Sequence, residues 1–404
     1  MNDSSRISRT MTLSAIVQAV TTYGPISRAS VAKMTGFSKQ TVSEIVSTLE
    51  KDGWVQIVGR AQGNVGRRAV MYEIVPDAAL VASVDLGGTK VRVALCNLSG
   101  AVVSEIKEPT VQSGGEAVVD QIAQMIIRAA KIEAIPTEKI RVTVVGVPGV
   151  PETETGKIMM APNIAGIDQI DFPTLLEARL GVEVLVENDV NLAALGEHWM
   201  THQGERDNLV FLSVGTGIGA GVVIGGKLVR GSTGGAGEIG FLPFGADPFE
   251  PESLKVGALE RVTATAAIID SYAAQTGEQR TVPEIFDAYL AGDEAATQAL
   301  ESAARHIALA IAAVAALVDP SCIVVGGSIG ARKELVEMIR KEISNCFPRP
   351  ITLEPSVLGS HAALAGGTSI ALSRLHISMF SGGLPGTRIE IPPPELNTFQ
   401  EDVA

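Results

Sequence analysis

The most constraining feature of the sequence is a glycine-rich stretch at residues 210–241, VFLSVGTGIGAGVVIGGKLVRGSTGGAGEIGF. Its pattern predicts two apolar strands joined by a turn through Gly215, Thr216, Gly217, Gly219 and Gly221, because glycine adopts turn conformations that other residues avoid. Glycine also lets backbone N–H groups approach a ligand closely, and the threonine adds a hydroxyl, so a phosphate group suits such a turn. Glycine-rich hairpins are more often plain turns, and this stretch alone leaves both interpretations open.

A second stretch of the same kind lies upstream, at residues 81–95, VASVDLGGTKVRVAL. An apolar strand ends at Asp85, the chain turns through Gly87, Gly88 and Thr89, and a strand with alternating apolar residues follows. The sequence therefore contains two candidate phosphate-binding hairpins, which favours the ligand-binding interpretation over a pair of plain turns.

With both stretches in view, nearly the whole chain resembles the ROK family (repressor, ORF, kinase), within the superfamily of sugar kinases, Hsp70 and actin. The resemblance rests on several motifs in order and not on any one of them. Besides the two glycine turns, they are residues 187–189 (END) followed by Asn191, residues 237–240 (GEIG) and residues 324–327 (VVGG). The resemblance implies an α/β protein whose main body has a two-lobed, actin-like ATPase fold.

The composition is that of an ordinary globular protein. A length of 404 residues with 46% hydrophobic residues predicts two or three domains with sizeable cores. The apolar run at residues 307–318 is too short to span a bilayer and the polar first residues lack a signal-peptide core, so we expect a cytoplasmic protein. The three cysteines form no CxxC pair, which argues against a disulfide framework or a cysteine metal site.

Charge is distributed unevenly along the chain. The net charge is −13, yet residues 1–76 hold nine Lys or Arg and five acidic residues, which gives this segment +4 and leaves −17 for the rest. A small basic module joined to a large acidic body indicates two separate tasks. A charge of +4 does not by itself show that the module binds nucleic acid.

Residues 1–76 have the pattern of a winged helix-turn-helix. Apolar residues recur at helical spacing over residues 10–23, Ser27 is placed to cap a second short helix, and Ser38 is placed to cap a third over residues 39–51. In such motifs, short polar or basic side chains at the start of the last helix reach base edges and phosphates in the major groove. Here these residues are Ser38, Lys39, Gln40, Thr41 and Ser43. A protein-protein docking module is the alternative interpretation.

A wing is predicted after the third helix. Residues 54–58 and 70–75 look like strands, and the loop between them contains Arg67 and Arg68. Taken alone, two arginines in a loop are typical of a solvated turn. After a helix-turn-helix, and with a Gly-Arg-Arg tip that resembles the wing of ROK repressors, they are expected to contact the DNA backbone or the minor groove.

The large body is predicted to begin after a short linker at Pro76-Asp77. Its expected strands are residues 80–85, 91–96, 101–106, 140–147, 182–186 and 321–325. Its expected helices are residues 115–132, 175–180, 190–199, 260–272, 295–318, 333–346 and 366–375.

Asp189 follows one of these strands. A carboxylate at a strand end beside a phosphate loop can accept the proton of an attacking sugar hydroxyl, while Mg²⁺ neutralises the developing charge on the phosphoryl group. If the protein is a kinase, Asp189 is therefore the catalytic base. The alternative role is that of helix N-cap for residues 190–199, and the two roles are compatible.

The resemblance to ROK sugar kinases implies further site residues. It assigns contacts with sugar hydroxyls to Asn188, Asp189, Glu238 and Glu260. It assigns ATP phosphates to the two glycine turns, with Asp85, Gly87, Gly88, Thr89, Gly215, Thr216 and Gly217. It also places Gly326 and Gly327 near the adenosine of ATP.

One segment departs from the ROK pattern. Many ROK proteins bind a structural zinc with a histidine and a cysteine-rich run after the glutamate that matches Glu238. Here Phe241 stands at the histidine position and Ala258 at the last cysteine position, and residues 243–256 contain no cysteine. We therefore expect no metal in this segment. The apolar residues expected to pack the segment instead are Leu242, Phe244, Phe249 and Leu254.

These observations predict four regions: a winged helix-turn-helix (1–76), lobe I (77–190), lobe II (191–376) with a terminal helix that returns to lobe I, and a mobile tail (377–404). The leading hypothesis is a sugar-responsive transcriptional regulator, a repressor of carbohydrate metabolism genes that works as a homodimer or homotetramer. A sugar or sugar phosphate would close the lobes and change the affinity for operator DNA. The alternatives are a sugar kinase that uses ATP and Mg²⁺ and carries an appended DNA-binding domain, or a body that merely dimerises.

Overall fold

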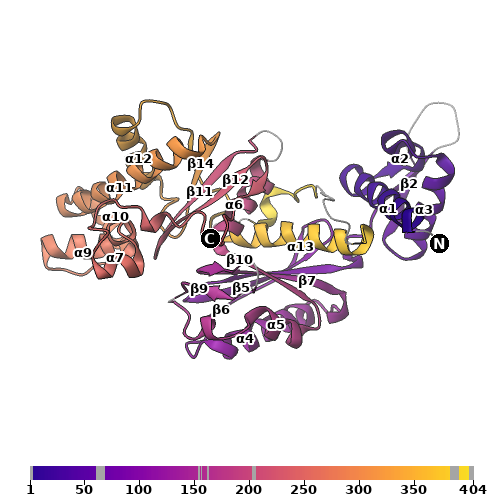
Figure 1. Ribbon diagram of the computed structural model, residues 1–404, viewed down its shortest axis with the longest axis horizontal. Helices are drawn as coiled ribbons and strands as arrows, with labels where there is room; N and C mark the ends of the chain where they lie inside the picture. Colours follow the sequence, from indigo (N-terminus) through magenta and orange to yellow (C-terminus); the bar gives the residue numbers. More distant parts are fainter. Residues whose placement is uncertain are drawn as a thin grey trace. The chain divides into compact units, whose positions relative to one another are not determined.

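The computed structural model describes residues 3–60, 69–152, 155, 157–161, 163–202, 206–382 and 391–399 (Figure 1). The chain forms two compact units. The first comprises residues 1–149, 156–187 and 367–398, and the second comprises residues 150–155, 188–366 and 399–404.

The N-terminal module of the first unit consists of three helices and a small sheet. The cap predictions are confirmed: the Ser27 and Ser38 side chains accept hydrogen bonds from the backbone N–H groups of Ser30 and Thr41. The helices are α1 (Asp3–Tyr23), α2 (Arg28–Thr35) and α3 (Lys39–Lys51). The strands β1 (Ile26–Ser27), β2 (Val55–Arg60) and β3 (Val70–Ile74) lie in the order β1-β3-β2, and the sequence did not predict β1.

The rest of the first unit is built on a five-stranded sheet in the order β10-β7-β4-β5-β6. The central strand β4 pairs antiparallel with β5 and parallel with β7, and all three are rich in valine because both of their faces are covered. Helices α4 and α5 cover one face (Figure 1). The bounds are β4 (Leu80–Leu86), β5 (Lys90–Asn97), β6 (Val102–Pro109), β7 (Ile140–Val147), β10 (Glu183–Asn188), α4 (Gly115–Ile132) and α5 (Phe172–Leu180). Two short strands lie outside this sheet: β8 (Val150–Pro151), which belongs to the second unit, and β9 (Ile158–Met159) of the first unit.

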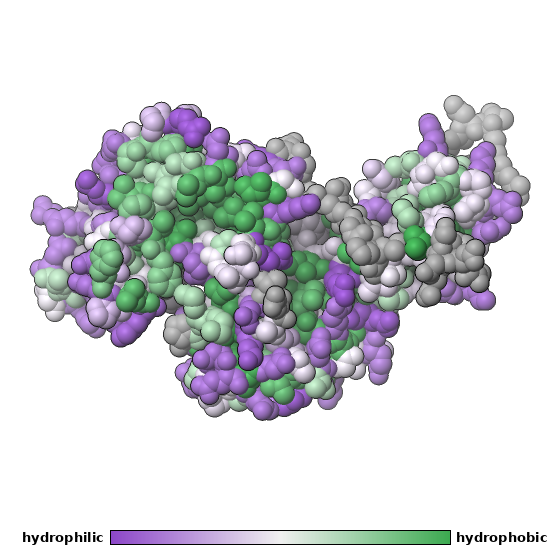
Figure 2. Space-filling view, viewed as in Figure 1, coloured by the Kyte–Doolittle hydropathy of each residue, from purple (hydrophilic) through white to green (hydrophobic). Residues whose placement is uncertain are grey.

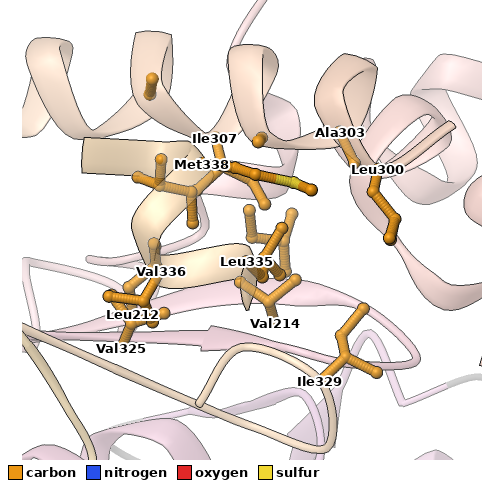
Figure 3. Packing of buried hydrophobic residues seen from close by; sticks show 14 of the residues in the cluster. Leu212, Val214, Leu300, Ala303, Ile307, Val325, Ile329, Leu335, Val336 and Met338 are labelled. Atoms are coloured by element: carbon orange, nitrogen blue, oxygen red, sulfur yellow. The ribbon is translucent and has the colours of Figure 1, made fainter. Parts of the chain in front are cut away.

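The second unit has its own five-stranded sheet, in the order β13-β12-β11-β14-β15. Leu212, Val214 and Val325 project from its strands into a hydrophobic core shared with α11 and α12 (Figure 3). The strands are β11 (Leu209–Val214), β12 (Ile218–Ile224), β13 (Lys227–Leu228), β14 (Cys322–Gly326) and β15 (Leu353–Pro355). The helices are α6 (Asp189–Glu197), α7 (Pro251–Val256), α8 (Glu260–Thr263), α9 (Thr265–Thr276), α10 (Val282–Leu290), α11 (Glu294–Val318) and α12 (Lys333–Cys346).

Helix α11 confirms the helix predicted at residues 295–318 to within one residue, and it extends well beyond the apolar run at residues 307–318. It has 25 residues and a mean hydropathy of 1.5, so by length and composition it is the one helix in the described part of the chain that could cross a membrane. A helix at the centre of a protein core meets the same criteria, and α11 buries Leu300, Ile307 and Ile311 in the core of the second unit. Figure 2 shows a further hydrophobic area (green) on the visible face, where Figure 1 draws β11 and β14.

The last helix, α13 (Ala362–Phe380), is also longer than predicted. Its first residues belong to the second unit and those from Gly367 onward belong to the first. Phe380 lies in the core of the N-terminal module, where its ring stands edge-on to that of Trp54 with the centroids 5.2 Å apart. Further on, Phe399 is 1% exposed and its ring contacts that of Trp199, which differs from the expectation of a mobile tail at residues 377–404.

Candidate functional site

The glycine turn of the second unit joins β11 to β12, but it is shorter than predicted, because Gly219 and Gly221 are residues of β12 and pair with β11. The last residue of β11 pairs with the first residue of β12, so Gly215, Thr216 and Gly217 form the turn. The N–H of Gly215 donates to the carbonyl of Gly217 at 2.9 Å. The backbone N–H and the hydroxyl of Thr265 both donate to the carbonyl of Gly215, each at 2.8 Å. Nothing in the sequence pattern pointed to Thr265.

Both glycines of this turn pack closely against side chains of the same unit, so a larger residue would require those side chains to shift. A Cβ at position 215 would lie 2.8 Å from the hydroxyl oxygen of Ser328, and a Cβ at position 217 would lie 2.6 Å from Oε2 of Glu260. Both distances are too short for a side-chain carbon. These glycines therefore have a structural reason to be present that is independent of phosphate binding.

The predicted adenosine-binding glycines lie beside this turn. Gly326 ends β14 and pairs with Ser213 of β11. Gly327 has a φ of +87°, and a Cβ there would clash with the backbone of Val214. The N–H of Ile329 donates to the carbonyl of Val214 at 3.1 Å, which holds the loop after β14 against the end of β11. The nucleotide-binding residues predicted in this unit are thus close in space, while their role in binding a nucleotide stays a prediction.

Glu260 lies against the same turn. Its Oε2 accepts a hydrogen bond from the N–H of Ile218 at 3.0 Å. Burial raises the pKa of Glu260, the bond from Ile218 opposes that effect, and the charge of Glu238 raises the pKa further. Burial also raises the pKa of Glu238. Two half-buried carboxyls that interact in this way are suited to accepting hydrogen bonds from a ligand with several hydroxyl groups.

Glu238 is held in place by the turn around it. Gly237 has a φ of +97°, and a Cβ there would collide with the carbonyl oxygen of Ala220. Ala220 donates its N–H to the carbonyl of Gly237 at 2.9 Å. The turn that carries Glu238 is therefore fixed to the middle of β12, while Glu260 is bonded to the first residue of the same strand.

Asn188 and Asp189 stand at the start of α6, which packs on β12. The side chain of Asn188 is the helix cap, because its Oδ1 accepts the N–H of Asn191 at 2.9 Å. The expectation that Asp189 is the N-cap is therefore wrong: Asp189 is the first helical residue, and its Oδ1 accepts the N–H of Val190 at 2.9 Å. A Cβ on Gly221 would lie 2.6 Å from the carbonyl oxygen of Val190, so the start of α6 lies directly against β12.

The upstream glycine turn belongs to the first unit. Asp85 is the residue before the end of β4, and the turn at Gly87, Gly88 and Thr89 leads into β5. The N–H of Gly87 donates to the carbonyl of Lys90 at 2.9 Å. A Cβ on Gly88 would lie 2.9 Å from Cβ of Asn163, so this glycine also has a packing role. A joint role of the two turns in holding ATP stays a prediction.

The predicted DNA-contacting residues differ in their solvent exposure and in the hydrogen bonds that their side chains already make. Ser38, Lys39 and Gln40 are exposed at the start of α3, and the Gln40 amide donates to Oε1 of Glu44 at 3.0 Å. The hydroxyl of Thr41 is 2.8 Å from that of Ser38. The hydroxyl of Ser43 accepts a hydrogen bond from Arg28 at 3.0 Å, so it already takes part in packing within the module. Arg67 and Arg68 lie outside the described residues.

The segment between Glu238 and Glu260 is packed only in part as expected. Leu242 and Phe244 pack against the core of the second unit. Phe249 and Leu254 do not, since they are 88% and 71% exposed, so the expectation that they pack the segment is wrong for these two residues. Residues 243–256 contain neither cysteine nor histidine, so the nitrogen and sulfur ligands of a structural zinc site are missing here.

Comparison with known proteins identifies the family. The ROK family pattern matches residues 81–374. The xylose repressor of Bacillus subtilis (strain 168) is 28% identical over 360 residues, which cover 86% of this chain and 91% of that protein. That coverage is longer than everything from residue 81 onward, so it extends into the N-terminal module.

Two solved structures have the same fold. The ROK hexokinase from Thermus thermophilus is 29% identical with a TM-score of 0.64, and the match covers 74% of this chain and 99% of the hexokinase. A ROK family transcriptional regulator, a homologue of the E. coli MLC protein, is 23% identical with a TM-score of 0.77, and the match covers 93% of this chain and 98% of the regulator. The body thus has the actin-like sugar kinase fold that the sequence predicted, and the chain belongs to the ROK family.

Proposed function

We propose that this protein is a sugar-responsive transcriptional repressor of carbohydrate metabolism genes. The main support for this proposal is the share of the chain that each related protein covers. The xylose repressor aligns with 86% of the chain, whereas the hexokinase matches 74% of the chain with almost its whole length. The alignment with the repressor therefore includes at least part of the N-terminal module, whereas the hexokinase is matched over almost its whole length by a smaller part of the chain.

The N-terminal module is the DNA-binding part in this proposal. Its helices and its sheet have the order of a winged helix-turn-helix, and residues 1–76 carry a net charge of +4 in an otherwise acidic chain. Lys39 and Gln40 at the exposed start of α3 enter the major groove, together with Ser38, Thr41 and Ser43. Arg67 and Arg68 of the wing contact the phosphate backbone.

The sugar site is built from Asn188, Asp189, Glu238 and Glu260 of the second unit. Glu238 and Glu260 are attached to β12, and the other two begin the helix packed on that strand. Their oxygens accept hydrogen bonds from the hydroxyls of a sugar or sugar phosphate. The protein acts in the cytoplasm as a homodimer or homotetramer, because repressors of this architecture bind pairs of half-sites about one helical turn apart.

A sugar kinase with an appended DNA-binding domain is the second candidate. It is favoured by the two intact glycine turns and by the similarity to a hexokinase. In that case Asp85, Gly87, Gly88 and Thr89 of one unit and Gly215–Gly217, Gly326 and Gly327 of the other would hold ATP with Mg²⁺. Bound ATP would supply the phosphoryl group. Asp189 would accept the proton of the sugar hydroxyl.

The proposal is tested by measuring DNA binding with and without sugar. Fluorescence anisotropy with a labelled DNA fragment from upstream of the gene gives the Kd, and a panel led by D-xylose and D-glucose serves as the effector. We expect one sugar to change the Kd about 5- to 150-fold, the range of ordinary allosteric coupling. Arg67→Ala combined with Arg68→Ala should weaken binding to all sequences and reduce the salt dependence.

Two outcomes would contradict the proposal. If the Kd for DNA is the same at saturating concentrations of every sugar, the protein is not sugar-responsive. The second outcome is turnover in a coupled assay with ATP and the same sugars that disappears in Asp189→Asn. In that case, the protein is a sugar kinase and not only a regulator.

A further inference from the structure

The segment of residues 247–257 lies between the two sugar-site glutamates and has little apolar packing of its own. Its helix α7 has only six residues, and Phe249 and Leu254 point their apolar side chains into solvent. Ser253, with 3% of its surface exposed, and Gly257 are the buried residues of the segment. A short exposed segment of this kind needs polar contacts to hold one conformation.

Arg261 supplies those contacts. Its Nη1 donates to Oε2 of Glu250 at 2.5 Å and to the hydroxyl of Ser253 at 2.7 Å. The hydroxyl of Ser253 in turn donates to the carbonyl of Asp247 at 2.6 Å. One guanidinium nitrogen thus binds two residues within the segment and reaches Asp247 through Ser253. Because Ser253 is buried, this is more than a surface ion pair.

The same segment is tied to the residues that carry the glutamates. The N–H of Arg261 donates to the carbonyl of Gly257 at 3.2 Å, and the N–H of Leu259 donates to the carbonyl of Gly240 at 3.0 Å. Gly257 has a φ of +89° and lies so close to Gly240 that a Cβ would collide with it. Movement of the segment would therefore displace residue 240, close to Glu238, and the start of α8, where Glu260 stands.

We propose that Arg261 is a positioning residue of the sugar site. By fixing the segment of residues 247–257, it keeps the side chains of Glu238 and Glu260 in the positions that bind the ligand. This inference rests on the proposed function, because it assigns Arg261 a role in the same site. Arg261 itself does not contact the sugar. A residue that acts through others should lose its effect gradually when its contacts are weakened one at a time.

The test compares Arg261→Ala, Arg261→Lys and Glu250→Ala in the full-length protein. The control is Arg280→Ala. Arg280 is another arginine of the second unit. It pairs with Glu278 at 3.0 Å and is distant in sequence from Glu238 and Glu260. Titration calorimetry with D-xylose and D-glucose measures affinity. We expect Arg261→Ala to weaken binding roughly 10-fold, and the control to leave it unchanged. Arg261→Lys should restore part of the loss, because both contacts come from one nitrogen.

Hydrogen exchange provides a readout that needs no sugar. The N–H of Ile218 donates a hydrogen bond to Glu260, so the protection of this N–H from exchange reports whether the Glu260 side chain keeps its position. We expect faster exchange at Ile218 in Arg261→Ala, a smaller effect in Glu250→Ala and none in Arg280→Ala. Unchanged exchange at Ile218, or equal sugar affinity in Arg261→Ala and the wild type, would overturn the inference. If the wild type binds no sugar of the panel while Ile218 still responds, the proposed function fails and the structural role of Arg261 stands.

Discussion

Glu238 and Glu260 are buried enough for their ionisation to affect stability. Burial raises the pKa of both carboxyls, so the folded protein holds their protons more tightly than the unfolded chain does. Their contribution therefore favours folding at a pH below the ordinary glutamate pKa, and it is lost as the pH rises through the raised values. At neutral pH, both carboxylates make the sugar-free protein less stable than neutral side chains would.

Glu260→Gln should therefore raise Tm at pH 7 by a few degrees, because it removes a half-buried charge, while it weakens sugar binding. The gain in Tm should shrink toward pH 4, where the wild-type carboxyl is protonated. Calorimetric unfolding at both pH values measures it. Glu284→Gln is the control, because hydrogen bonds from Thr281 lower the pKa of the exposed Glu284, and its replacement should not raise Tm. A lower Tm for Glu260→Gln at pH 7 would contradict the argument.

The residues that position the site were not visible in the sequence. Glu238 and Glu260 follow from the resemblance to the ROK family, and the glycine turns follow from their own composition. Thr265 and Ser328 matter because the fold brings them against Gly215, and Arg261 matters because the chain folds back so that its side chain reaches Glu250 and Ser253. No periodicity or motif in the sequence marks these contacts, so they cannot be predicted from a single sequence.

Among the elements, those with local signals were predicted well. Helices α3, α4 and α12 and strand β7 have the predicted bounds, because caps and apolar periodicity mark them within a few residues. The expected helix at residues 260–272 is instead α8 and α9, broken at Ala264, after which Thr265 bonds to Gly215. Helix α13 starts four residues earlier than expected, because residues 362–365 are good helix formers and the helix continues through Gly366 and Gly367, where close tertiary packing compensates for the weak helix propensity of glycine.

Helix α3 is the element that should determine DNA sequence preference. Gln40 is exposed on its first turn and keeps its amide oriented by a hydrogen bond to Glu44. We expect Gln40→Ala to lose about 1–3 kcal/mol of discrimination between the operator and a variant with one changed base pair, with little change in binding to unrelated DNA. Lys39→Ala should instead weaken binding to all sequences and lower the salt slope. Anisotropy titrations on the three DNA fragments would contradict this if Gln40→Ala keeps the wild-type discrimination.

At the scale of the whole molecule, the single helix α13 has residues in both compact units, one with the proposed sugar site and the other with the proposed DNA-binding module. In the second unit, its first turn packs on α6: a Cβ on Gly366 would collide with the carbonyl oxygen of Leu192. Helix α6 begins with the sugar-site residue Asp189. In the first unit, the last turn of α13 ends inside the module, where Phe380 contacts Trp54 and the hydroxyl of Ser381 lies 2.9 Å from that of Ser14. We expect a shift of α6 on sugar binding to reach the module through this continuous helix.

Phe380→Leu should weaken this link without unfolding the module, because leucine keeps most of the apolar contact and loses the ring packing on Trp54 and His376. We expect unchanged sugar affinity and nearly unchanged DNA affinity without sugar. The ratio of the two DNA Kd values, with and without sugar, should fall toward 1. Leu317→Ala, at an 86% exposed position on α11, is the control and should keep the wild-type ratio. A wild-type ratio in Phe380→Leu would mean that the sugar signal travels by lobe closure alone and not through the end of α13.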